Sequence, residues 1–497
     1  MNTKEWLRQL VMFGVLMAAS RGSAGSYYVA MNGSDTNPGT QQAPWRTIVY
    51  AMEKTASGDT VFVRSGSYPE GELFINAEDG QGGAPGKMWT LKGYRNERPA
   101  LNINVKVYAG YVRIQGFRFE GGGVFVRFDH PGHCEILNNH FVGEFGYGAV
   151  EAGGDSNLIA GNYIEIDSAV TSTLDHGIYI HGGIGSIIRN NVVKNSSGYG
   201  IHLYDERGYD LQDIIVENNQ VYGSRLRSGI IVALGGNSRA RNITIRNNVV
   251  VHNEVDGIAV RDAAQNVKIY NNTIYGVGQN GIYFKYDVDN VIVRNNIIHL
   301  GAGREHIYNN NNAPGIIVDH NLYWPAPLKI TDVVAANPLI ANPLFVNETQ
   351  FNFKLKSNSP AIDAGVDVGL PYSGNLPDIG AEEFDGSTAG VGSSEAGSPQ
   401  SFVLHQNFPN PFNPETTITY HLPVAAAVTL AIYDLQGREV RRLVDVTQAS
   451  GEHQARWDGK NQMGETVAGG VYICRLTARK TGSENVLKES TRMLLLR

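Results

Sequence analysis

A short run of alternating apolar residues that ends in asparagine, usually in a pair, recurs through the middle of the chain. The final asparagines follow one another at steps of 23, 29, 28, 29, 24, 24 and 25 residues. They are Asn139, Asn162, Asn191, Asn219, Asn248, Asn272, Asn296 and Asn321. Repeats of this length cannot bury an apolar face alone, so they stack on their neighbours. The repeat therefore predicts a solenoid.

A second recurring element lies between the asparagines, where a glycine opens another short alternating run. Residues 177–180, 200–203 and 281–284 are examples. These runs are short, rich in β-branched residues and bounded by Gly and Asn, which is typical of strands, whereas helical repeats would show a 3.6-residue period over longer windows. Each repeat is therefore predicted to form a strand-turn-strand coil, with stacked coils about 4.8 Å apart.

The paired asparagines have a structural explanation. Where two strands meet at a sharp corner, one residue takes the left-handed conformation, which Asn tolerates better than other non-glycine residues. Identical Asn side chains on successive coils can also hydrogen-bond to each other as a ladder. The first residue after each strand-opening glycine is expected to face the core. This column contains Ile178, Ile201, Ile230, Ile258 and Ile282.

These ladders and coil lengths resemble the right-handed parallel β-helix of the pectate-lyase-like superfamily, over residues 25–330. Residues 27–48 also resemble the opening of secreted bacterial β-helix proteins related to polysaccharide lyases, with a capping helix near 51–54 and a first coil at 58–64. The resemblance implies an all-β protein. It does not fix the activity, because lyases, hydrolases, epimerases and adhesins share this fold.

The first residues of the chain have the pattern of a secretory signal. Lys4 and Arg8 precede an apolar run over 10–19, and small residues follow up to Ala24. We interpret residues 1–24 as a signal peptide, cleaved after Ala24. No later segment has about 18 uninterrupted apolar residues, so no membrane span is expected and the protein is predicted to be secreted.

Three segments are expected after the solenoid. Residues 331–385 are interpreted as its C-terminal cap, and residues 386–400, made largely of Gly, Ser and Ala, as a flexible linker. Residues 401–497 alternate like the strands of a small β-sandwich. Their motifs at 408–414 and 457–459 resemble the immunoglobulin-like C-terminal sorting domain of the type IX secretion system. That resemblance implies Sec export and type IX machinery as a partner; a carbohydrate-binding or spacer sandwich is the alternative.

Composition adds mainly exclusions. The chain has 41 basic and 48 acidic residues, a formal charge of −7, so nucleic acid is not an expected partner. Two cysteines, Cys134 and Cys474, cannot form a disulfide framework and are predicted to be buried as small apolar residues. We expect a monomer.

Two outward columns follow from the strand alternation. The second residue after each glycine gives Phe125, Val150, Tyr179, His202, Ile231, Ala259 and Tyr283. The fourth gives Arg127, Ala152, His181, Tyr204, Ala233, Arg261 and Lys285. The run that starts at Gly148 fits this register poorly, and Glu151 is the alternative exposed residue there. The columns thus gather His, Tyr, Arg and Lys, with almost no carboxylate.

Such groups suit the removal of a proton beside a sugar carboxylate, which needs cations on the carboxylate, a base and, for elimination, an acid. Tyrosine acts as the base only where neighbouring cations depress its pKa. Our catalytic candidates are His181, Tyr204, His202, Tyr179 and His176. Our substrate-binding candidates are Arg127, Arg261, Lys285, Arg207 and Asp175. The sequence Asp175-His176, followed by Tyr179, is similar to the Asp/His/Tyr constellation of alginate-epimerase β-helices, without their full motif.

The sequence thus predicts a carbohydrate-active protein that acts on an acidic, uronate-containing polysaccharide by β-elimination or C5-epimerisation. A glycoside hydrolase is one alternative, although it needs two carboxylates across the scissile bond, which the columns do not supply. A non-catalytic adhesin or glycan-binding solenoid is another. No cofactor is required by the pattern. Carboxylates at strand ends are weak Ca²⁺ candidates: Asp205, Glu206, Asp262 and Asp287.

Overall fold

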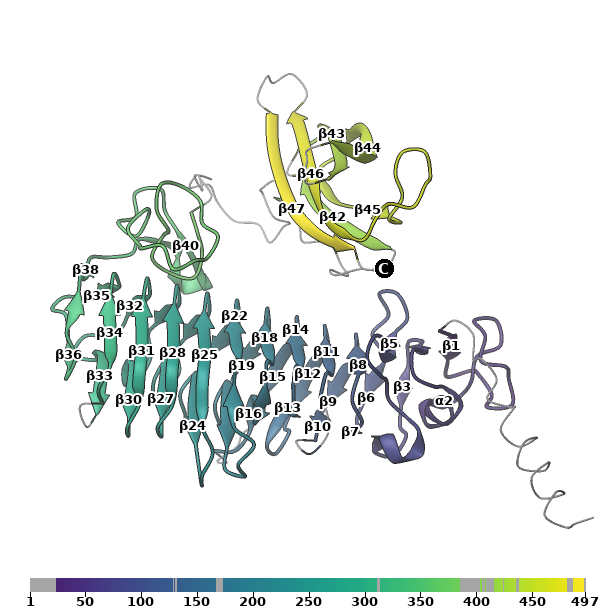
Figure 1. Ribbon diagram of the computed structural model, residues 1–497, viewed down its shortest axis with the longest axis horizontal. Helices are drawn as coiled ribbons and strands as arrows, with labels where there is room; N and C mark the ends of the chain where they lie inside the picture. The colour runs from purple at the N-terminus through teal and green to yellow at the C-terminus, as the bar shows by residue number, and fades with distance from the viewer. Residues whose placement is uncertain are drawn as a thin grey trace, which may run out of the picture. The chain divides into compact units, whose positions relative to one another are not determined.

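The computed structural model divides the chain into two compact units, the first up to Thr388 and the second from Ala389. It describes residues 24–127, 129, 132–166, 173–310, 313–384, 403–404, 407, 415–422, 424–434, 438–480 and 486–495. The predicted signal peptide, apart from Ala24, lies outside these residues, as do the linker and the motif at 408–414. Figure 1 shows the strands of the first unit stacked side by side along one axis.

Within its described part, the first unit contains three long parallel sheets, which each coil of the chain visits in turn. Sheet 1 has 15 strands: β1 Ser26–Val29, β2 Thr60–Val63, β5 Trp89–Gly93, β8 Val112–Gln115, β11 Glu135–Leu137, β14 Leu158–Ala160, β17 Gly183–Ile184, β18 Ile187–Arg189, β21 Leu211–Gln212, β22 Ile215–Glu217, β25 Ala240–Arg246, β28 Gln265–Tyr270, β31 Asp289–Arg294, β34 Ile316–Asp319 and β37 Ala335–Ala336. Sheet 2 has 12 strands: β3 Ser67–Tyr68, β6 Ala100–Leu101, β9 Arg118–Glu120, β12 His140–Gly143, β15 Tyr163–Ile166, β19 Val192–Lys194, β23 Gln220–Tyr222, β26 Val249–Val251, β29 Thr273–Tyr275, β32 Ile297–His299, β35 Leu322–Trp324 and β38 Leu339–Ile340. Sheet 3 has 11 strands: β4 Leu73–Asn76, β7 Val105–Tyr108, β10 Val124–Val126, β13 Gly148–Gly153, β16 His176–His181, β20 Ile201–Asp205, β24 Ile230–Leu234, β27 Ile258–Arg261, β30 Asn280–Lys285, β33 Glu305–Asn310 and β36 Ile330–Thr331. This arrangement is a parallel β-helix, as the repeat predicted.

Both predicted roles of the asparagines are confirmed, and they fall on different members of each pair. The first member takes the left-handed conformation, as at Asn190 and Asn218, where φ is 56° and 55°. The second member is buried and forms the ladder: Asn191 Nδ2 donates to Asn219 Oδ1 at 2.9 Å, and Asn219 Nδ2 donates to Asn248 Oδ1 at 3.0 Å. One residue therefore makes the corner, and the next ties the coils together.

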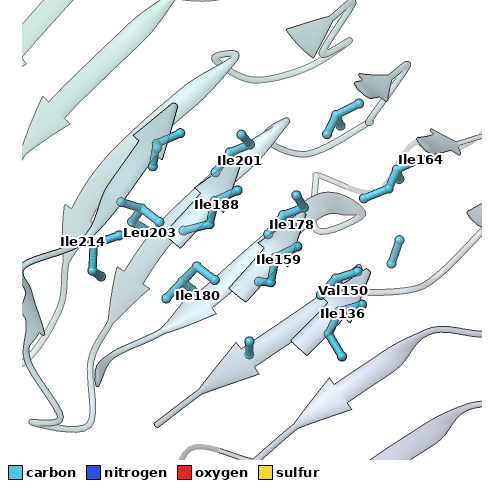
Figure 2. Close-up of a cluster of buried hydrophobic side chains, with 14 of the residues drawn as sticks. Ile136, Val150, Ile159, Ile164, Ile178, Ile180, Ile188, Ile201, Leu203 and Ile214 are labelled. Atoms are coloured by element: carbon cyan, nitrogen blue, oxygen red, sulfur yellow. The ribbon is translucent and has the colours of Figure 1, made fainter. Parts of the chain in front are cut away.

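The core is the inside of the β-helix. The predicted inward isoleucines, such as Ile178 and Ile201, are fully buried, and Figure 2 shows them in line with the core residues of neighbouring coils. Cys134 and Cys474 are buried free thiols, as predicted.

The N-terminal end has the predicted helix. Helix α2, Ile48–Lys54, starts at the N-cap Thr47, whose hydroxyl oxygen accepts a hydrogen bond from the Tyr50 N–H. Its residues Ile48, Ala51 and Met52 join the core of the first coils. Among the described residues, no helix is both long and apolar enough to cross a membrane.

The C-terminal end of the solenoid differs from our prediction. Parallel pairing continues to β38, so the coils extend beyond residue 330. Residues 345–384, with β39 Phe345–Asn347, the 3₁₀ helix η2 Glu348–Gln350 and β40 Asn352–Leu355, pack against the side of the β-helix at sheet 2. The physical reason lies in β26, whose three valines are all buried. The outward face of this strand is apolar, and covering it with residues 345–384 removes it from water.

The second unit consists of two antiparallel sheets among its described residues, in agreement with the predicted sandwich. One sheet pairs β41 Val403–Leu404, β42 Thr416–Leu422 and β45 Gly451–Trp457, and the other pairs β43 Ala426–Tyr433, β44 Glu439–Gln448, β46 Gly470–Lys480 and β47 Val486–Leu495. Trp457, Tyr420 and Leu430 belong to its separate apolar core.

Candidate functional site

The outward face of sheet 3 carries the predicted His and Tyr side chains on neighbouring strands, and we call it the site face. Along it, Glu151 of β13 pairs with Tyr179 of β16, and Tyr179 pairs with His202 of β20. His181 and Tyr204 stand two residues further along β16 and β20. Parallel strands are about 4.8 Å apart, so these side chains lie within reach of one another.

The register at β13 corrects one part of the predicted columns. Val150 is fully buried and pairs with Ile178 in the core (Figure 2), so its outward placement was wrong. Ala152 is also fully buried. Ala149 occupies the place that a glycine has in the next repeat, which moves the strand by one residue. A shift of one residue exchanges the two faces of a strand. Glu151, the alternative exposed residue, is confirmed on the site face.

Glu151 and His181 form a hydrogen-bonded pair. Glu151 Oε2 lies 3.1 Å from His181 Nε2, and the two side chains keep 18% and 15% of their surface exposed. An ionised carboxylate only accepts hydrogen bonds, so Nε2 of a neutral His181 carries the proton and Nδ1 holds a lone pair. A carboxylate that orients an imidazole in this way also stabilises the imidazolium ion. His181 is therefore arranged to accept a proton at Nδ1.

His176 and His202 form a second hydrogen-bonded pair, which presents an N–H donor where His181 presents a lone pair. The Tyr199 N–H donates to His176 Nδ1 at 2.9 Å, and His176 Nε2 lies 3.2 Å from His202 Nδ1. A neutral His176 must then donate from Nε2 to His202 Nδ1, which leaves the proton of a neutral His202 on Nε2. Burial lowers the pKa of His176 to about 3 and that of His202 well below its ordinary value. This pair is built to stay neutral and to present an N–H group.

Aromatic rings complete the site face around these two pairs. The His202 ring stacks with Tyr179, with centroids 4.6 Å apart, and with Tyr204 at 5.3 Å. Burial raises the pKa of Tyr179, and burial together with a hydrogen bond from Tyr204 to Glu206 raises the pKa of Tyr204 to about 12. The condition for a tyrosine base, a depressed pKa, is therefore not met, and both hydroxyls stay protonated near neutral pH and can donate hydrogen bonds.

The predicted cations do not converge on this cluster. Arg127 follows β10, two strands to one side of β16, and pairs with Asp129 at 3.1 Å. Arg261 on β27 and Lys285 on β30 are three and four strands to the other side. Arg207, just after β20, is nearer, because its charge partly offsets the rise in the Tyr179 pKa.

Two predicted residues lie beneath the site face instead of on it. Asp175 is 2% exposed, accepts a hydrogen bond from the Phe145 N–H at 3.3 Å, and has its pKa raised to about 6 by burial. It is therefore placed as a structural residue, in contrast to the predicted substrate contact. His176 is also 2% exposed and reaches the site face through its hydrogen bond to His202 and its edge contact with the Tyr179 ring, 5.3 Å between centroids.

The predicted calcium ligands do not form a cluster. Asp205 Oδ2 already accepts hydrogen bonds from the Arg207, Gly208 and Tyr209 N–H groups and from the Ser238 hydroxyl. Among the residues that the structure describes, no three His, Cys, Asp or Glu side chains gather in a way that could hold a metal ion. The carboxylates of Glu206, Asp262 and Asp287 therefore do not join Asp205 in one site.

A cavity of about 220 Å³ opens on the site face beside the histidine cluster. Tyr199, Arg227, Asp256, Arg261 and Tyr283 are among the residues that line it. Of these, Tyr199 and Arg227 are not among the residues that the sequence predicted. The residue just before each strand-opening glycine provides the signal for Tyr199, since this third column contains His176, Tyr199, Ser228, Asp256 and Asn280, whereas Arg227 lies one residue before the column.

The fold and its site face define a right-handed parallel β-helix protein with an accessible sheet rich in His, Tyr and Arg. The chain belongs to the family described as Pel9A-like, right-handed beta-helix region, whose model matches residues 27–296. Residues 413–482 match the FlgD Ig-like domain. The two family matches fall on the two compact units.

The chain is also similar to individual proteins. The uncharacterized protein YwoF of Bacillus subtilis strain 168 is 39% identical over 85 residues, and the match spans 17% of this chain and 17% of that protein. The crystal structure of pectate lyase Pel9A is 17% identical, with a TM-score of 0.49 over 73% of this chain and 97% of the other. The A-module of the Azotobacter vinelandii mannuronan C-5 epimerase AlgE6 is 15% identical, with a TM-score of 0.37 over 59% and 93%. The family assignment rests on the family model.

Proposed function

We propose that this protein acts on an acidic, uronate-containing polysaccharide by β-elimination or the related C5-epimerisation. The observation that carries the proposal is the partly exposed Glu151–His181 pair beside the neutral His176–His202 pair, in which His202 keeps 8% of its surface exposed. These pairs supply a proton acceptor and a fixed N–H donor on adjacent strands. The Pel9A-like family and the pectate lyase of that name are in keeping with such a substrate.

Both reactions begin with the same step. The C5–H bond breaks, the proton passes to His181 Nδ1, and the electron pair moves onto the uronate carboxylate as an enolate. In elimination this pair then forms the C4–C5 double bond, the C4–O bond breaks, and the leaving oxygen takes a proton. In epimerisation a proton returns to C5 from the opposite face. The Tyr204 hydroxyl, which a pKa of about 12 keeps protonated near neutral pH, is the candidate donor for either step.

The second histidine pair would stabilise the charge that develops. His202 Nε2–H, held in place through His176, can donate to the enolate oxygen without first losing a proton of its own. A fixed donor of this kind costs no reorganisation when the charge appears. The positive charge of Arg207, which reaches Tyr179, adds to this stabilisation.

The proposal is tested by incubating the purified protein with alginate, pectate and glycosaminoglycans. Elimination produces an unsaturated uronate that absorbs at about 230 nm. Epimerisation in D₂O places deuterium at C5. His181→Ala should abolish both signals. A matched control is His140→Ala, since His140 lies on sheet 2 and packs against Tyr163, 4.6 Å between ring centroids. New reducing ends without absorbance would instead favour a hydrolase, and binding without turnover would favour an adhesin.

The second unit supports a separate proposal about location. We infer that residues 401–497 act as a type IX sorting domain and that the protein is secreted through Sec and then type IX machinery. The match to an Ig-like domain is in keeping with this function, as is the predicted signal at residues 1–24. The test is expression in a bacterium with this system. Deletion of residues 401–497 should retain the protein in the periplasm, and a deletion that leaves secretion unchanged would contradict the proposal.

A further inference from the structure

The cavity beside the histidine cluster has an apolar floor between aromatic walls. Ile231 and Ala259 form the floor at outward positions of β24 and β27, where the adjacent strands carry His202 and Tyr283. Because Ala259 has only a methyl group, the surface is lower there than at Tyr283. Tyr199 lines the cavity as well. Aromatic faces next to an apolar floor suit the C–H face of a sugar ring.

Two arginines at this cavity are available to a ligand. Arg261 Nε is buried and has no hydrogen-bond partner among the described residues, and its ion pair with Asp262 is long, at 3.8 Å. The Arg227 guanidinium lies 5.8 Å from the centroid of the Tyr199 ring and forms no ion pair within the described part of the chain. A guanidinium group offers several donors in a planar fork that matches a carboxylate.

The one acidic group that lines the cavity is already engaged. Asp256 is 4% exposed; its Oδ1 accepts a hydrogen bond from Asn280 Nδ2 at 2.7 Å, and its Oδ2 accepts one from the Ser228 hydroxyl at 3.1 Å. Burial raises the pKa of this carboxyl. Both oxygens are therefore used within the protein, although the charge of Arg261 partly offsets the rise in this pKa. The ion pair of Arg261 at the cavity is the long one with Asp262.

The cavity is continuous with the histidine cluster through Tyr199, whose ring lies 4.6 Å from the His202 ring. From β20 to β27 there are two strand spacings, or about 10 Å. The volume of about 220 Å³ is below the ~300–1,000 Å³ of sites for larger ligands, so it fits one sugar ring better than a length of chain. A chain laid along the site face would thus place one unit over the cluster and another in the cavity.

We propose that this cavity is a binding subsite for a single uronate unit that does not react, with Arg227 and Arg261 recognising its carboxylate and the tyrosines holding its ring. The inference rests on the proposed function for its substrate and adds where specificity is set. A neutral sugar in the cavity would leave the guanidinium donors unpaired, so the subsite selects chains that are acidic at this position.

The experiment measures binding and turnover separately. Calorimetry with a tri-uronate from the active polysaccharide, or from pectate if none is turned over, compares the wild type with Arg261→Ala and Arg227→Ala. We expect each variant to lose at least about tenfold in affinity. A matched control is Lys268→Ala, an exposed cation on sheet 1. In turnover, Arg261→Ala should raise KM and leave kcat within about twofold, because the bound unit does not react.

The outcomes separate this inference from the proposed function. Affinity that depends on the two arginines without any turnover would support the subsite and reject the enzyme. Turnover with full affinity in both variants would reject the subsite and keep the enzyme. Equal binding of the reduced, neutral tri-saccharide by the wild type would also overturn it, as would an absence of tri-uronate binding. If Arg261→Ala fails to fold, as judged by its unfolding transition, Arg261→Met keeps the stem of the side chain and replaces it in the test.

Discussion

The corner between sheets 1 and 2 and the outward face of sheet 3 use the same coil repeat in opposite ways. At the corner, every coil from Asn139 to Asn321 places the same residue at the same point, and each side chain bonds to the next. On the site face, the equivalent positions carry Glu151, Tyr179, His202, Ile231 and Ala259. The corner repeats its chemistry, and the site face changes it from strand to strand.

The difference follows from what each position must do. Every coil has to turn at the corner and satisfy the backbone there, so the same residue is required each time. On an outward face nothing in the stacking fixes the residue type, because the backbone hydrogen bonds of the sheet are complete without it. The β-helix thus supplies a fixed spacing in both places, and specific chemistry appears where the repeat does not dictate the side chain.

The largest effect is expected from His181→Ala on the site face. Loss of the proton acceptor should lower turnover by about 10²–10⁴-fold, the usual contribution of a general base. Stability should fall by about 1–3 kcal/mol, because the largely buried Glu151 loses its hydrogen-bond partner. The measurement is kcat on the active polysaccharide, together with the midpoint of urea unfolding. A variant with full activity would remove His181 from the mechanism.

The buried histidine pair predicts a loss of stability in acid. The folded-state pKa of His176, about 3, is below its ordinary value of 6.5, and that of His202 is also depressed. The unfolded chain therefore binds more protons as the pH falls below 6.5, and stability decreases by up to about 1.4 kcal/mol per pH unit for each histidine.

Asp175 acts in the opposite direction over part of this range. Its pKa is raised from 3.8 to about 6, so the stability it contributes is present at low pH and is lost as the pH rises through these values. Other buried carboxyls such as Asp256 act like Asp175, and buried histidines such as His299 and His306 act like His176, so the contribution of the pair is read from the difference in slope between the wild type and a histidine variant. Urea unfolding between pH 7 and pH 4 would check this, at about the limits where the groups titrate. In His176→Gln the slope should be shallower; an unchanged slope would contradict the assignment.

At the corner, adjacent asparagines should respond differently to the same change. Asn219→Gly removes a buried side chain that bonds to Asn191, Asn248 and the Ile188 carbonyl, and should cost about 1–3 kcal/mol of stability. Asn218→Gly is the matched control. Its φ of 55° is one that glycine adopts freely, so stability should change by less than about 1 kcal/mol. Activity per folded molecule should be unchanged in both. Equal losses would mean that the ladder is not the stabilising element.

Much of the fold was predictable because the ladder and the inward isoleucines repeat in sequence. The site face was less so. The place of Glu151 depends on one extra small residue, Ala149, which moves the register of β13. His176 and Tyr199 stand before the strand-opening glycines, and their contacts to His202 depend on how neighbouring coils pack. Residues 331–385 were predicted as a cap on the end of the solenoid, whereas residues 345–384 cover its side, since a chain segment carries no sequence signal of which surface it will cover.

The smallest effect is expected from Tyr204→Phe, which separates the two steps of the reaction. The Tyr204 hydroxyl donates to Glu206 at 2.9 Å and has a pKa of about 12, so it is protonated near neutral pH and is a candidate donor and not the base. The variant should slow product formation by about tenfold and leave exchange of the C5 proton in D₂O unchanged, because His181 still accepts that proton. Val150 is not a useful position for such a variant, because it faces the core. Glu206→Gln is a suitable control, because it keeps the Tyr204 hydroxyl, and it should retain most of the activity. If exchange and product formation fall together in Tyr204→Phe, Tyr204 takes part in the first step and the division of roles between the two strands is wrong.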